Sequence, residues 1–184
     1  MKFDLLDALS EYEPIDENDK KILNLFIEFL KTNNNCFDRK NFNGHVTAGA
    51  LIMDREANVL INHHKDLDMW LMFGGHSDGN SDSLAVAKRE VEEECGITEY
   101  DDLGGKILDI DYHEVPENPH KNEPAHYHFD VRFLFIVNDN YYKISNESKE
   151  AKWVTIEEAK ILMKSADKIR VLNKAYQKYL KIKK

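Results

Sequence analysis

Apolar side chains recur with two different periods along the chain, and the change of period separates a helical beginning from a strand-rich middle. Asp16, followed three positions later by Asp19, is typical of a helix start, and the run Asn33–Asn35 ends the helical pattern. Between them, one apolar stripe has helical spacing: Ile22, Leu23, Phe26, Phe29 and Leu30. We therefore expect a helical extension over residues 1–40 that packs on the main domain, with a separate partner-binding helix as the alternative.

From His45 onward the pattern favours strands, interrupted by amphipathic helices. The predicted strands are 45–53, 58–62, 107–113, 126–137 and 153–154, the first two forming a hairpin. The predicted helices are 83–95, a second that opens at the Thr155 and Glu158 capping box, and a third from about Ala166. Strands mixed with helices predict one α/β (α+β) domain over residues 41–184.

Composition narrows the class of protein. The 184 residues carry a formal net charge of −9, which opposes binding to nucleic acids and membrane surfaces, since both are anionic. Two cysteines are too few for a disulfide framework. The N-terminus lacks the pattern of a signal peptide, and the sequence has no apolar run of transmembrane length. We therefore expect a cytoplasmic protein, and a homo-oligomer stays open.

Three glutamates fall on one side of the helix predicted over residues 83–95. With about 100° per residue, Glu90, Glu93 and Glu94 share an arc of about 100°. Like charges at this spacing repel one another unless a cation or solvent separates them. The side chains therefore either point into water and pair with neighbouring Lys88 or Arg89, or bind a hard divalent cation. Gly74–Gly75 precedes the helix and permits a close approach of the backbone to a ligand.

At these residues the chain resembles the Nudix hydrolases, whose defining box is GX5EX7REUXEEXGU, with U an aliphatic residue. Eight of the nine fixed positions match over Gly75–Ile97. The matching residues are Gly75, Arg89, Glu90, Val91, Glu93, Glu94, Gly96 and Ile97. The resemblance implies an α/β/α sandwich with a mixed sheet, extending from about residue 45 to 160.

The resemblance also implies a function. Glu90, Glu93 and Glu94, helped by the carbonyl of Gly75, would hold Mg²⁺ or Mn²⁺, and Arg89 would orient a glutamate. Water would attack a pyrophosphate linkage in a nucleoside diphosphate derivative or related organic pyrophosphate, with Glu93 nearest that water. A distal base or further ligand is expected at Glu147 or Glu150, for which a solvated loop acid is the alternative.

One departure from the box leaves other functions open. The first box glutamate is Ser81 here, which cannot offer a charged ligand, so a nucleotide-binding or sensor module without turnover is the main alternative. Gly75–His76 resembles an element of the related isoprenoid diphosphate isomerases, but the cysteine ahead of that element is missing. Residues 160–184 carry a local charge of +8, which fits a solvated helix face better than a nucleic-acid site.

Histidines are the second unusual feature of the sequence. On the strand over 126–137, a polar face alternates with an apolar one and carries His126, His128, Asp130 and Arg132. We expect His128, Arg132 and His76 to bind substrate, with Arg132 meeting a phosphate. A transition-metal site built from imidazoles and a hydrogen-bonded polar face are the alternatives.

Overall fold

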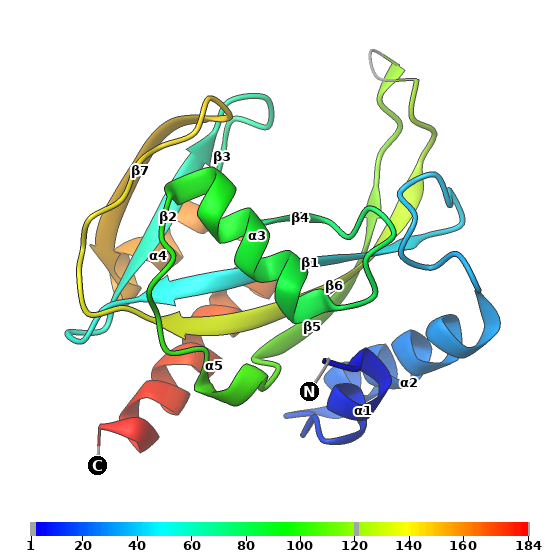
Figure 1. Ribbon diagram of the computed structural model, residues 1–184, viewed down its shortest axis with the longest axis horizontal. Helices are drawn as coiled ribbons and strands as arrows, with labels where there is room; N and C mark the ends of the chain where they lie inside the picture. Colours follow the sequence, from blue (N-terminus) through cyan, green and yellow to red (C-terminus); the bar gives the residue numbers. More distant parts are fainter. Residues whose placement is uncertain (1–2, 120–121, 184) are drawn as a thin grey trace.

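A seven-stranded mixed sheet between two layers of helices dominates the computed structural model, which describes residues 3–119 and 122–183 (Figure 1). The strands are β1 (His45–Met53), β2 (Asn58–His64), β3 (Met69–Leu71), β4 (Phe73–His76), β5 (Asp109–Val115), β6 (His126–Ile136) and β7 (Ser148–Thr155). The helices are α1 (Leu5–Ser10), α2 (Glu17–Thr32), α3 (Ser83–Cys95), the 3₁₀ turn η1 (Leu103–Gly105), α4 (Ile156–Met163) and α5 (Ala166–Ile182).

Strand β1 is the centre of the sheet. The order is β3-β2-β1-β6-β5, with β4 added to β1 and β7 added to β2. β1 runs parallel to β6, whereas the other pairs are antiparallel. Every residue of β1 is buried, as expected for a strand that is covered on both faces.

The period of two in β6 divides the apolar core between the two faces of the sheet. Phe129, Val131 and Phe133 point into a cluster shared with α1, α2 and α3. Leu134 and Ile136 belong to a second cluster, shared with α4 and α5. In Figure 1, α3 crosses one face of the sheet, and α5 lies behind the other. The α/β/α sandwich is thereby confirmed.

The N-terminal helices pack on the sheet rather than standing apart. Asp16 caps α2 by accepting the backbone N–H of Asp19, and Phe29 stacks on Phe129 of β6 with ring centroids 3.9 Å apart. This packing agrees with the expected extension. The domain boundary at residues 40 and 41 stays a prediction.

Several elements differ from the sequence-based expectation. β3 and β4 lie inside a segment that the sequence pattern predicts to be a loop. These short strands form by pairing with β2 and β1, and no local pattern predicts them. β7 extends over eight residues instead of two, since it pairs along β2. No helix in the described residues is long and apolar enough to cross a membrane.

Candidate active site

Helix α3 presents two of its glutamates, Glu90 and Glu94, to the strand that precedes it. Asp82 caps the helix by accepting the backbone N–H of Ala85 at 2.9 Å, and Gly96 ends it in the left-handed conformation. Val86, Ala87 and Val91 of the same helix are buried against the sheet. This packing holds Glu90 and Glu94 beside β4, where they meet Gly75 and Gly74.

Glu94 is the most buried of the three box glutamates, at 8% exposure. Its carboxylate accepts the backbone N–H of Gly74 at 2.8 Å, which joins α3 to β4. The pKa of Glu94 is raised to about 8, chiefly by burial; the hydrogen bond from Gly74 opposes this shift, and the nearby charges of Glu90, Glu147 and Glu93 contribute to it. A group with this pKa is poised to exchange its proton for a cation near neutral pH.

Glu90 lies directly against Gly75. A Cβ at Gly75 would come within 2.6 Å of the Glu90 carboxylate, so glycine is needed for this close approach. Arg89 donates from the same Nη2 to Glu90 Oε1 at 2.5 Å and to the carbonyl oxygen of His76 at 2.7 Å. Burial raises the pKa of Glu90, although the Arg89 charge opposes this shift. Arg89 thus contacts Glu90, and its expected role in orienting a glutamate stays a prediction.

Glu93 differs from its two neighbours because it faces solvent. Its side chain is 64% exposed and lies 4.0 Å from Nε of Arg89. The three carboxylates therefore run from a buried position to an open one along one side of α3. Clustered carboxylates and the neighbouring backbone of Gly75 are hard oxygen donors, which fit Mg²⁺ or Mn²⁺.

A pocket of about 890 Å³ opens beside these glutamates. This volume lies within the range of small-molecule sites. Of the residues expected in the site, the pocket wall includes Gly75, His76, Glu90, Glu94, His128, Arg132 and Glu147. Among the described residues, Glu150 does not line it, and this side chain pairs instead with Lys152 at 3.8 Å. Of the two candidate distal acids, the structure brings only Glu147 to the pocket.

Arg132 reaches the pocket wall from within a buried charge network. Its guanidinium lies 2.7–3.6 Å from four carboxylates, those of Asp109, Asp111, Asp130 and Asp167. Its charge is thus matched inside the protein, and the geometry does not support the expected contact with a substrate phosphate. Three of its acidic partners come from other elements, so local sequence patterns do not reveal this network.

Part of the basic C-terminal segment also serves this network. Arg170 of α5 donates to Asp109 at 2.9 Å and to Asp111 at 3.2 Å. Lys174 donates to Asp109 at 2.6 Å and to Asp19 of α2 at 2.8 Å. The segment is therefore not simply a solvated face, because these two cations neutralise acidic residues of β5 and α2.

Ser81 lies away from the glutamates. It lines a smaller pocket of about 210 Å³ together with residues at and just before the start of α1, such as Phe3 and Leu5, and is absent from the described wall of the large pocket. The departure from the box therefore leaves the glutamate side of α3 intact.

Sequence reasoning missed His45, which lies against His76 and His128, with ring centroids 5.1 and 4.8 Å away. It also missed the pair formed by His113 and Asp111, whose Nδ1 and Oδ2 atoms are 2.9 Å apart. The period of two in β1 places His45 on the same face as Thr47, and this is the one signal in the sequence that could have pointed to it.

The chain is similar in sequence to a known protein family and to one named protein. The NUDIX domain model matches residues 44–175. A Lactococcus lactis protein named "Probable DHNTP pyrophosphohydrolase" is 30% identical over 135 residues, which cover 73% of this chain and 78% of that protein.

Solved structures share the fold at lower identity. A Caenorhabditis elegans Ap4A hydrolase in a binary complex has a TM-score of 0.59 at 19% identity, covering 74% of this chain and 97% of that one. The Escherichia coli dihydroneopterin triphosphate pyrophosphohydrolase has a TM-score of 0.57 at 19% identity, with coverage of 70% and 92%. The chain therefore belongs to the Nudix family and is a hydrolase that acts on pyrophosphate bonds.

Proposed function

We propose that the protein hydrolyses a pyrophosphate linkage in a nucleoside phosphate or a related organic pyrophosphate, with Mg²⁺ or Mn²⁺ as cofactor. The observation that carries this proposal is the position of Glu90 and Glu94 in the wall of the large pocket, with Gly75 pressed against the Glu90 carboxylate. Glu90, Glu93, Glu94 and the Gly75 carbonyl would hold the cation. When bound, a divalent cation neutralises phosphate charge and lowers the pKa of the attacking water.

The protein's own groups prepare this site. Arg89 holds Glu90 in place and ties it to the backbone of β4 through the His76 carbonyl. The Gly74 N–H does the same for Glu94. Glu93 is exposed, which makes it the carboxylate that reaches solvent water, and we assign it the role of orienting that water. Glu147, which directly precedes β7 and lines the same pocket, is the candidate for a further base or ligand.

The relatives supply substrates to test. Their names and titles mention DHNTP, Ap4A and dihydroneopterin triphosphate, and a solved Francisella tularensis neighbour, with a TM-score of 0.54 at 16% identity, holds AMP and a Mn ion. The pocket is large enough for compounds of this size. Nucleotides and nucleotide-like compounds are therefore the first substrates to test.

The test is a hydrolysis screen with nucleoside triphosphates, dihydroneopterin triphosphate, Ap4A and ADP-ribose, in Mg²⁺ and in Mn²⁺. Phosphate release is measured with and without an added phosphatase, which separates phosphomonoester products from free phosphate. We expect turnover of at least one compound, lost in chelator and reduced at least about 100-fold in Glu93→Gln. The matched control is Glu92→Gln, an exposed neighbour that is not a box glutamate. Equal loss in both variants, or full activity of Glu93→Gln, would contradict the proposal.

A further inference from the structure

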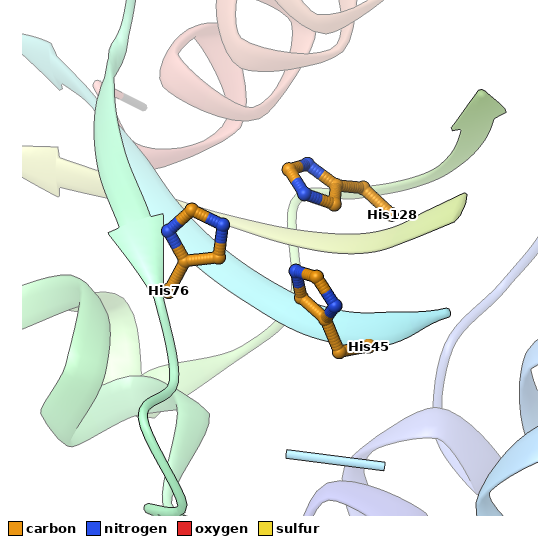
Figure 2. A group of neighbouring side chains, drawn as sticks. All are labelled: His45, His76 and His128. Atoms are coloured by element: carbon orange, nitrogen blue, oxygen red, sulfur yellow. The ribbon is translucent and has the colours of Figure 1, made fainter. Parts of the chain in front are cut away.

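Three histidines converge next to the carboxylate site, and we propose that they form a second metal site, for a transition-metal ion such as Zn²⁺. His45, His76 and His128 each offer one ring nitrogen, and the three nitrogens lie within 4.8 Å of one another (Figure 2). Imidazole nitrogen suits Zn²⁺, Co²⁺ and Ni²⁺, whereas Mg²⁺ prefers oxygen. The proposal is independent of the proposed reaction at the glutamates.

Strand pairing brings the three side chains to one face of the sheet. His45 is the direct partner of His128 in the parallel pair of β1 and β6. His76 is the partner of Thr47 in the antiparallel pair of β1 and β4, and Thr47 shares a face with His45. Figure 2 shows the rings turned toward one another from these three strands. A site held by three adjacent strands is rigid, as metal sites require.

His45 has an unused ligand atom that points into the cluster. Its Nδ1 lies 3.2 Å from the Asn41 carbonyl oxygen, to which it donates a hydrogen, so Nε2 carries the lone pair. The side chain is 1% exposed, and Nε2 has no hydrogen-bond partner in the described part of the chain. A buried acceptor without a partner costs about 1–3 kcal/mol. A metal ion would satisfy it, and the Asn41 carbonyl would orient the ring as outer partners of zinc ligands do.

His128 is oriented by a neighbouring histidine. Nδ1 of His126 donates to the Pro124 carbonyl at 2.8 Å, so its Nε2 accepts a hydrogen. That Nε2 lies 3.2 Å from Nε2 of His128, which must therefore donate. This leaves Nδ1 of His128 with a free lone pair. The hydrogen bond to His126 thus fixes the orientation of the His128 ring beside His45 and His76.

The imidazoles are held in the neutral form that binds metal. Burial favours the neutral form of His45 and His128, because it lowers the pKa of both imidazoles. The nitrogens of a tetrahedral zinc site lie about 3.3 Å apart, so those within 4.8 Å here need to approach by at most about 1.5 Å. His76 is only half-buried and has room for this adjustment.

The cluster leaves a coordination position open toward the large pocket. His76 and His128 line that pocket, and His76 directly follows Gly75. Three protein ligands with one open position are typical of a zinc ion that meets a small molecule rather than of a closed structural site. The protein would thus carry a carboxylate site and an imidazole site on one pocket, each selective for a different class of cation.

The test is titration of the full-length chain with Zn²⁺ and Co²⁺ in the presence of millimolar Mg²⁺, which occupies the glutamates. We expect one equivalent of each ion to bind, with the visible absorption of tetrahedral Co²⁺. His76→Ala and His128→Ala should each weaken Zn²⁺ binding at least about 100-fold. His45→Ala should do the same. His45 is fully buried, so His45→Ala could fail to fold. In that case the variant of the half-buried His76 is the decisive test.

Two control variants separate this site from other sources of binding. His63→Ala removes a histidine that stacks on Trp70 outside the cluster, and it should leave Zn²⁺ affinity unchanged. The double variant Glu90→Gln and Glu93→Gln should likewise keep Zn²⁺ affinity, even if hydrolysis is lost. Unchanged binding in His76→Ala and His128→Ala, or loss of binding in the glutamate double variant, would overturn the proposal.

Discussion

Glu94 accepts the backbone N–H of Gly74 at 2.8 Å, and this bond joins the glutamate helix α3 to strand β4. It holds a buried carboxylate in place before any cation arrives. The same strand supplies Gly75 against Glu90 and the His76 carbonyl to Arg89. The residues proposed to bind metal are therefore organised by the contact of one short strand with one helix.

Substitution of Gly75 tests the close approach of backbone and carboxylate. In Gly75→Ala the new Cβ would lie 2.6 Å from the Glu90 carboxylate, which can swing away because it is the end of a flexible side chain. We expect the Mg²⁺ concentration that gives half-maximal activity to rise by about 10–100-fold, with little loss of stability. Activity against Mg²⁺ concentration and thermal unfolding are the measurements.

Gly49→Ala is the contrasting variant. Here the new Cβ would meet the backbone oxygen of Phe73 at 2.3 Å, where neither strand can give way cheaply. We expect this variant to lose stability rather than metal affinity alone. Equal unfolding temperatures for the two variants would contradict the distinction.

The raised pKa of Glu94 predicts how stability depends on pH. Its pKa is 4.5 in an unstructured reference and about 8 in the folded, metal-free protein. Between pH 4.5 and about 8 the folded state therefore binds one more proton than the unfolded state. This contribution to stability is lost as pH rises through about 8. Metal-free Glu94→Gln should be more stable than the parent at pH 9, by about 2–4 kcal/mol, and similar to it at pH 4.5.

Chemical denaturation in chelator at both pH values measures this difference. Glutamine keeps an oxygen for the Gly74 N–H, so the comparison isolates the charge. Glu92→Gln, at an exposed position of the same helix, is the control and should show no such crossover. A parent protein that is the more stable of the two at pH 9 would refute the assignment.

Lys174 tests the ion network between α2 and α5. Its Nζ lies 2.6 Å from Asp109 and 2.8 Å from Asp19, two carboxylates that are fully buried. Lys174→Met should lower the free energy of unfolding by about 3–5 kcal/mol, because the carboxylates lose a buried partner. Urea denaturation measures the loss. Lys181→Met, at an exposed position of the same helix, should change little, and adding Asp19→Asn to Lys174→Met should recover part of the loss.

Ser81 tests whether the departure from the box affects turnover. Because it lines the smaller pocket by α1 and not the large one, Ser81→Ala should keep kcat within about 2-fold of the parent. Steady-state kinetics with the best substrate of the screen decides this. A loss comparable to that of Glu93→Gln would place Ser81 in the active site after all.

Much of the fold was predictable because local patterns carry it. Strand β1 and helix α3 have the predicted bounds, and the capping box of Thr155 and Glu158 is formed as expected. In contrast, β3 and β4 have too few residues for a period to emerge. Their structure depends on partners in β2 and β1, which local reading does not reveal.

The two chemical features of the pocket differ in the same way. Glu90, Glu93 and Glu94 are neighbours in sequence, so the helical repeat alone places them on one side of α3 and marks the family. The environment of Arg132 and the meeting of His45, His76 and His128 follow from strand pairing between segments up to 83 residues apart. Local periodicity sets which face a residue takes, but long-range pairing sets its neighbours, and those neighbours give Arg132 its carboxylates and His45 its histidines.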